Sequence, residues 1–217
     1  MDVGIVLPQG WLGEYHGWDH GRAWSRTLAI AREAERLGFE SVWAYDHFTP
    51  VNAPAEEPTF EAFAVLAAVA AVTSRVRLGP LVAGVGYRNP ALLAKMTGTL
   101  DVIAGGRFEI GVGAGWKRDE YAAFGYPFPP LGERMALLRD TLEILALMLG
   151  PDAGRGSYDG SQASVRRPWN APRGAQEPRV PITVGGNGRE VTWRLAARFA
   201  DEINLHGLHV ADGRSDI

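Results

Sequence analysis

The sequence predicts an α/β protein of the TIM (β/α)8-barrel type, and two observations carry this prediction. Strand-like and helix-like segments alternate along the whole chain, and successive strand-like runs begin near residues 3, 41, 76, 108, 182 and 202. This alternation is typical of a parallel sheet covered by helices. The candidate functional residues follow the carboxyl ends of the strands, which favours a barrel over an open doubly wound sheet.

Local features support each element. Residues 3–7 are a short apolar run that ends at Pro8, as expected for a strand buried on both faces. From Arg22, apolar residues recur at helical spacing until Gly38, a residue type that commonly ends helices. The remaining predicted elements are strands over 41–45, 76–85, 108–112, 182–184 and 202–205, and helices over 60–72, 90–104, 131–149 and 189–199. Thr59 has N-cap chemistry for the second helix, and Asn89 followed by Pro90 has N-cap and first-turn chemistry for the third.

We expect a single domain over residues 1–217, with an irregular insertion at about 151–181 that is rich in Gly, Pro, Arg and Ser. A complete (β/α)8 barrel normally needs about 250 residues. The chain therefore contains about six βα units and is expected to be an incomplete barrel. Unpaired strand edges promote association, so we expect a homo-oligomer, a dimer, to cover the edge after residues 202–205.

Composition narrows the class of function. The apolar fraction is 46%, the charged fraction is 22% and the net charge is −3, so neither nucleic acid nor a membrane surface is an expected partner. There is no cysteine, no signal-peptide pattern and no apolar run long enough to span a bilayer, which predicts a cytoplasmic protein. The pairs His16/His20 and His206/His209 lack a supporting carboxylate pattern, so no metal site is expected. A serine hydrolase is disfavoured because no G-x-S-x-G elbow is present.

Asp46 and His47 follow the second strand directly and are the candidate catalytic residues. At the rim of a barrel, a histidine is well placed for general acid–base work, with its ring oriented by polar neighbours. The alternative is structural: Asp46 caps the next turn and His47 packs at the rim. We favour the catalytic interpretation because barrel chemistry lies at such strand ends.

Glycines follow the next three strands. Gly84 and Gly86 flank Val85, and this pattern fits either a β-bulge or a surface that approaches a flat ring. Gly113, Ala114 and Gly115 leave backbone amides exposed to a ligand, but G-x-G-x-x-G is absent, so this is no dinucleotide fingerprint. Gly185, Gly186, Asn187 and Gly188 precede a predicted helix. This turn fits a phosphate site better than an ordinary loop capped by Asn187.

Several stretches resemble the bacterial luciferase-like flavin and deazaflavin oxidoreductases, especially the branch that uses coenzyme F420. The matching stretches are RLGFESVWAYDHF, VRLGPLVAGVGYRNPALLAKMTGTLDVIAGGRFEIGVGAGW, EYAAFGYPFPPLGERM and VPITVGGNGREVTWRLAARFADEINLHG, which together cover most of residues 1–208. The block over 76–135 is the most specific of these in length and order.

The resemblance implies a TIM-barrel oxidoreductase that transfers a hydride between F420 and a small organic substrate. It further implies that Asp46 and His47 form the rim pair and that Gly113, Ala114 and Gly115 lie beside the cofactor ring. A non-prolyl cis peptide at Gly84-Val85 is expected behind the ring, and residues 185–188 are expected to hold the phosphate. Some deazaflavin dehydrogenases carry an acid directly after the strand-four glycines, where this chain has Trp116. The alternatives are an FMN-dependent monooxygenase and a non-catalytic flavin-binding or degenerate barrel fragment.

Overall fold

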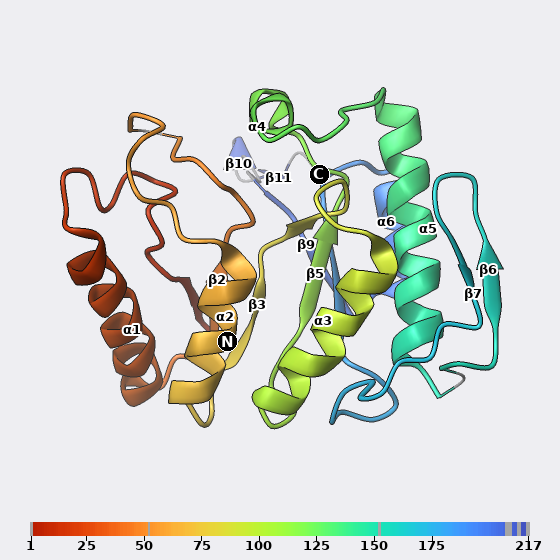
Figure 1. The fold of residues 1–217 in the computed structure, drawn as a ribbon, viewed down its shortest axis with the longest axis horizontal. Helices are drawn as coiled ribbons and strands as arrows, with labels where there is room; N and C mark the ends of the chain where they lie inside the picture. The colour runs from red at the N-terminus through yellow and green to blue at the C-terminus, as the bar shows by residue number, and fades with distance from the viewer. Residues whose placement is uncertain (1, 52, 152, 207–209, 212–213, 216–217) are drawn as a thin grey trace.

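The strands of the protein form a curved parallel wall. The computed structural model describes residues 2–51, 53–151, 153–206, 210–211 and 214–215. Two hydrogen-bonded parts of the wall have the orders β1-β2-β3 and β4-β5-β8-β9, and a parallel bridge between Leu78 and Phe108 joins them (Figure 1). The bounds are β1 Gly4–Val6, β2 Ser41–Ala44, β3 Arg77–Pro80, β4 Ala83–Gly84, β5 Ile110–Gly113, β8 Ile182–Gly185 and β9 Glu202–Asn204.

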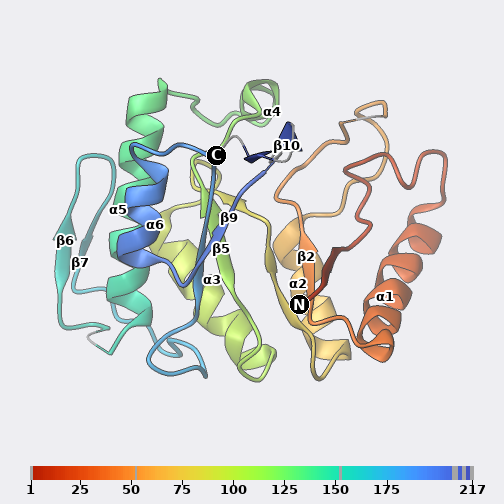
Figure 2. The ribbon, with the colours of Figure 1, turned by 180° about the vertical axis from the view of Figure 1, so that it is seen from behind.

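The predicted α/β class is confirmed, and all pairings within the wall are parallel. In the described ranges the wall does not close, since no pairing joins β9 to β1. Figure 2 shows the wall from behind, with β5 and β9 in view. A short antiparallel pair, β10 (Val210–Ala211) with β11 (Arg214–Ser215), follows β9. His209, considered above as part of a metal site, lies outside the described residues.

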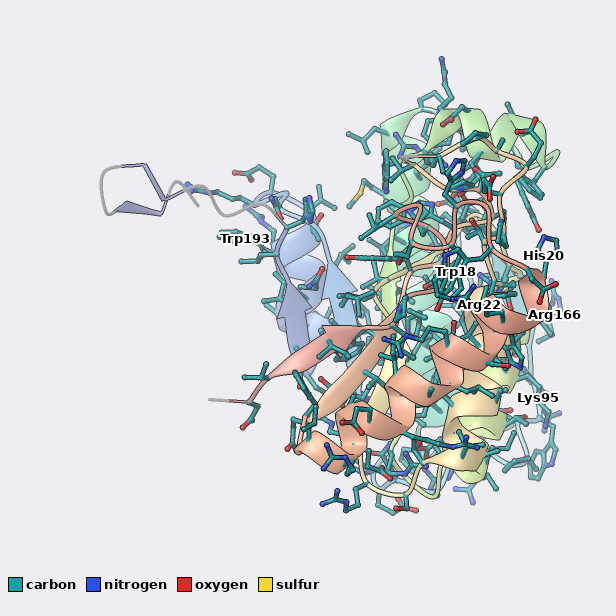
Figure 3. The ribbon with its side chains drawn as sticks, turned by 90° about the vertical axis from the view of Figure 1, so that its left-hand side faces the viewer. Trp18, His20, Arg22, Lys95, Arg166 and Trp193 are labelled. Carbon is teal, nitrogen blue, oxygen red and sulfur yellow. The ribbon has the colours of Figure 1, made fainter. Side chains whose placement is uncertain are left out.

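The helices begin and end largely where the local chemistry predicts. Their bounds are α1 His20–Leu37, α2 Ala62–Val72, α3 Pro90–Ile103, α4 Arg118–Ala123, α5 Leu131–Leu149 and α6 Thr192–Phe199. The Asn89 side chain caps α3, and Gly38 ends α1 in the left-handed region. The Thr59 cap was wrong, because the Glu61 carboxylate accepts from the Ala64 amide and α2 begins at residue 62. Figure 3 shows Trp18 and Arg22 side by side at the start of α1, with the guanidinium 4.3 Å from the ring centroid.

The segment over 151–181 is more ordered than its composition suggested. It contains the antiparallel hairpin of β6 (Ser157–Asp159) and β7 (Ser164–Arg166). Two buried aspartates attach the segment to helices: Asp140 accepts from the Gln162 amide at 2.7 Å, and Asp101 accepts from the Ala175 amide at 2.7 Å. Further long-range hydrogen bonds join Asn170 to the Met148 carbonyl and Gln176 to the Phe108 carbonyl. Such contacts define the path of a segment whose sequence shows no periodicity.

The two faces of the wall differ in composition. Ile110 and Val112 of β5 are buried in the hydrophobic core, whereas Gly111 and Gly113 alternate with them and face the other side. This second face forms the interior of the barrel segment. It therefore has space for a cavity at the carboxyl ends of the strands.

Candidate functional site

A cavity of about 570 Å³ lies at the carboxyl ends of the strands. Its lining comes from β4, β5, β8 and β9, from the segments that follow β1, β2, β3, β5, β8 and β9, and from the first residue of α6. The lining residues are Trp11, Tyr45, His47, Val51, Leu81, Val82, Ala83, Gly84, Gly113, Ala114, Gly115, Trp116, Gly185, Gly186, Thr192, Asn204 and His206. Seven of the eleven predicted site residues line it: His47, Gly84, Gly113, Ala114, Gly115, Gly185 and Gly186. The other four, Asp46, Val85, Asn187 and Gly188, do not.

The floor of the cavity is the side chain of Val82 set among glycines. A Cβ built on Gly113 would lie 2.9 Å from Val82 Cγ2, and one built on Gly185 would lie 2.7 Å from the same atom. A Cβ on Gly111 would also be too close to Val82. The alternating glycines of β5 therefore make room for a valine from the neighbouring strand segment, and Val82 presents an apolar surface to the cavity.

The predicted position of the cis peptide was wrong. The non-prolyl cis bond joins Leu81 and Val82, between β3 and β4, and not Gly84 and Val85. Val85 is buried in the core, and its amide donates to the Gly113 carbonyl at 3.0 Å. It is a wall residue rather than a ligand contact.

Gly84, Gly86 and Gly115 surround the ring of Tyr121. A Cβ on Gly86 would lie 2.6 Å from the Tyr121 ring, and one on Gly84 would lie 3.2 Å from its hydroxyl. Gly115 adopts φ +76°, a left-handed conformation that favours glycine. These glycines therefore accommodate a buried tyrosine from α4, a reason that their spacing alone does not reveal.

His47 lies on the cavity wall between two tryptophans. Its ring stacks on Trp11 with centroids 4.6 Å apart and meets Trp116 edge-on at 5.5 Å. Its Nδ1 lies 2.8 Å from Oε2 of Glu120, and its side chain is 12% exposed. One ring nitrogen is thus held by a carboxylate, which leaves Nε2 as the nitrogen available to the cavity.

Glu120 is the candidate site residue that the sequence analysis missed. It lies on α4, and its side chain is fully buried. Its Oε1 accepts from the backbone amides of Phe48 and Thr49 at 2.9 and 3.1 Å, so it also fixes the loop that carries His47. The one available signal was an acidic residue four positions after Trp116. That signal does not identify a partner 73 positions earlier in the chain.

Electrostatics keep Glu120 ionised. Burial by itself would raise the pKa of this carboxyl, but hydrogen bonds from His47, Tyr87 and the Phe48 amide outweigh burial and hold the pKa well below its usual range. The Tyr87 hydroxyl donates to Oε2 at 2.6 Å. Burial and the adjacent carboxylate raise the pKa of Tyr87 far above its usual value, so Tyr87 remains a donor.

Asp46 supports the wall instead of facing the cavity. Its carboxylate accepts two hydrogen bonds from Arg88, at 2.7 and 2.9 Å, and one from the Gly84 amide at 2.9 Å. The Asp46 side chain is 1% exposed, and Arg88 also contacts Glu61. The geometry thus gives Asp46 a structural part, as an ion pair with Arg88 and not as the cap of the next turn, and leaves His47 as the candidate catalytic residue that lines the cavity.

The glycine turn after β8 reaches the cavity only with its first two members. Asn187 and Gly188 are exposed, and the Asn187 side chain bonds the backbone of His206 in both directions, at 2.6 and 3.1 Å. The helix that follows begins at Thr192 and not directly after the turn. The Gly186 amide donates to the Asn204 carbonyl. The turn therefore does not lead straight into the helix, but Thr192, the first residue of α6, lines the cavity together with Gly185 and Gly186, and the phosphate site stays a prediction.

Two further observations concern other classes of site. Over the described ranges, no three His, Asp or Glu side chains gather in a way that would hold a metal ion. Within those same ranges, no helix combines the length and apolar character needed to cross a bilayer.

Comparison with known proteins identifies relatives of this chain in sequence and in structure. A family model described as luciferase-like monooxygenase matches residues 1–215. An uncharacterized protein of Mycobacterium tuberculosis is 34% identical over 188 residues, which cover 80% of this chain and 64% of that protein. The F420-dependent glucose-6-phosphate dehydrogenase of Amycolatopsis mediterranei is 31% identical over 175 residues, which cover 80% of this chain and 51% of that enzyme.

A solved structure of a monooxygenase from Streptomyces bottropensis superimposes with a TM-score of 0.76 at 26% identity, covering 91% of this chain and 57% of that one. The chain thus spans between about half and two thirds of the length of each of these proteins.

Proposed function

This chain belongs to the luciferase-like monooxygenase family, and we propose that it is an oxidoreductase that transfers a hydride between coenzyme F420 and a small organic substrate. One observation carries the proposal: His47 stands on the wall of a sheltered cavity with Nδ1 bound to a buried carboxylate and with an apolar floor nearby. The similarity to an F420-dependent dehydrogenase supports the choice of coenzyme.

The residues present fit a flat ring system. The cavity volume of about 570 Å³ lies within the range of about 300–1,000 Å³ that is usual for small-molecule sites. Its floor, Val82 in the glycine cradle, has no polar side-chain atom, and a Cβ at Gly113 or Gly185 would displace it. Val82, Gly113, Ala114, Gly185 and Gly186 would hold the ring, which would supply the hydride-accepting or hydride-donating centre when bound.

The chain's own residues then have separate tasks. His47 exchanges a proton with the substrate oxygen through Nε2, which balances the charge that accompanies hydride transfer. Trp11 fixes the imidazole plane by stacking, and Trp116, which is 62% exposed at the cavity, can shield the bound substrate from water. Glu120 and Asp46 hold the loop and the wall on which these groups stand.

The test is a pair of titrations followed by one substitution. We expect F420 to bind at least about tenfold more tightly than FMN, read by fluorescence quenching, a difference of about 1.4 kcal/mol. His47→Ala should leave F420 affinity nearly unchanged and lower turnover of a panel of small alcohols and carbonyl compounds by about 10²–10⁴-fold.

A second candidate, an FMN-dependent monooxygenase, is favoured by the structural similarity to the Streptomyces enzyme. Tighter binding of FMN together with oxygen consumption would select it. Tight binding of either cofactor without turnover of any substrate would instead indicate a non-catalytic binding protein.

A further inference from the structure

The hydrogen bonds around Glu120 fix where the protons lie. Oε1 accepts from the Phe48 and Thr49 amides, from the Thr49 hydroxyl at 3.2 Å and from Lys117 Nζ at 3.3 Å. Each of these groups approaches Oε1 as a donor. Oε1 therefore has no place for a proton, and the lowered pKa of this carboxyl leaves none on Oε2, so the carboxylate is ionised.

The second oxygen, Oε2, decides the state of His47. Two groups reach it: the Tyr87 hydroxyl at 2.6 Å and His47 Nδ1 at 2.8 Å. An ionised carboxylate accepts and does not donate, so the contact with Nδ1 requires a proton on Nδ1. A neutral imidazole carries one proton only, which leaves a lone pair on Nε2.

We propose that Glu120 is a positioning residue that holds His47 in the tautomer protonated on Nδ1, so that Nε2 presents a proton acceptor to the cavity. The ligand atom opposite Nε2 is then a donor, a hydroxyl or an N–H group. During oxidation of an alcohol, the hydroxyl proton passes to Nε2 and the imidazolium that forms lies beside the Glu120 carboxylate. This consequence for turnover rests on the proposed function, whereas the tautomer itself does not.

Glu120→Gln is the informative substitution because the surrounding donors orient the amide. Four donors converge on the position of Oε1, so the amide oxygen should occupy it. The amide nitrogen then faces His47 Nδ1 and donates to it. The imidazole proton must then lie on Nε2, so Nε2 presents a donor to the cavity in place of the acceptor that it presents in the parent. Replacing an orienting carboxylate by its amide in this way can cost up to about 10⁴-fold in rate.

Tyr87→Phe is the matched control. It removes one hydrogen bond from the same oxygen, Oε2, but leaves the carboxylate in place. A purely structural disturbance near Oε2 should therefore appear in both variants, whereas inversion of the tautomer should appear only in Glu120→Gln.

The experiment is ¹⁵N NMR of the imidazole rings at about pH 8.5, above the ordinary imidazole pKa, on the chain without cofactor. His47→Ala identifies the His47 signals among the five histidines. We expect protonated Nδ1 in the parent and in Tyr87→Phe, and protonated Nε2 in Glu120→Gln, with near-UV circular dichroism reporting the fold of each variant. Protonated Nε2 in the parent, or an unchanged tautomer in folded Glu120→Gln, would overturn the proposal.

Turnover separates this inference from the proposed function. If the tautomer inverts as expected, Glu120→Gln should reduce F420-dependent turnover by about 10²-fold or more with little change in F420 affinity. The expected tautomers in a parent that binds no F420 would support the role of Glu120 and refute the choice of cofactor.

Discussion

A methyl group at Gly185 should destabilise the protein through a single neighbour, Val82. The added Cβ would lie 2.7 Å from Val82 Cγ2 and 3.1 Å from Cγ1, and the shorter distance is below any that real Cβ atoms adopt. Gly185 is not among the glycines with positive φ, so alanine meets no backbone strain there. The clash with Val82 is therefore the main cost of Gly185→Ala.

The magnitude follows from two opposing effects. Overpacking a well-filled site costs about 1–3 kcal/mol. Replacing glycine by alanine at a compatible backbone position returns about 0.4–1 kcal/mol, because the unfolded chain loses freedom. We therefore expect Gly185→Ala to lower the free energy of unfolding by about 1–2 kcal/mol, or the Tm by roughly 2–8 °C for a chain of this size.

A double-mutant cycle measured by urea unfolding checks the assignment. Val82→Ala removes both γ-methyl groups of a half-buried side chain and should cost at most about 1.6 kcal/mol, from about 0.8 kcal/mol for each fully buried group. In its presence Gly185→Ala should cost almost nothing, which gives a coupling of at least about 1 kcal/mol. Effects of the two substitutions that add within about 0.5 kcal/mol would refute the reasoning.

Gly111→Ala is the control for this cycle. Its Cβ would meet Val82 Cγ1 at 2.8 Å, but it would also strike the backbone carbonyl oxygen of Pro80. Backbone cannot move as a side chain does. Val82→Ala should therefore relieve only part of the destabilisation at position 111.

Two further outcomes are expected. Asp46→Asn should lower the free energy of unfolding, measured in urea, by about 3 kcal/mol, because the buried guanidinium of Arg88 then keeps only Glu61 as a charged partner. Full stability together with lost turnover would instead indicate a catalytic role for Asp46. The chain should self-associate through the groove between α6 and β9, which Trp193 (Figure 3) lines and where Ile203 is 42% exposed. Ile203→Lys should then shift sedimentation toward the monomer, and a parent that sediments as a monomer at high concentration would contradict this.

Local chemistry was enough to predict the alternating strands and the five longer helices, but not α4, the β6–β7 hairpin or the division of residues 76–85 into β3 and β4. The apolar period identifies α5 over residues 131–149, and Asn89-Pro90 marks the start of α3, because capping and periodicity depend on residues close together in the chain. The alternation of strands and helices then brings the carboxyl ends of the strands to one edge. Hence the sequence also indicated where the cavity lies and that His47 stands beside it.

Only the tertiary structure decided what each residue at that edge does. The partner of His47 is Glu120, 73 positions away, and the partner of Asp46 is Arg88, 42 positions away. The glycines of β5 accommodate Val82 from the neighbouring strand segment. Such contacts depend on the register of neighbouring strands and on the path of the loops between them. Neither is encoded in a local pattern, so glycines at adjacent strand ends turn out to line the cavity, to accommodate a valine or to accommodate a tyrosine ring.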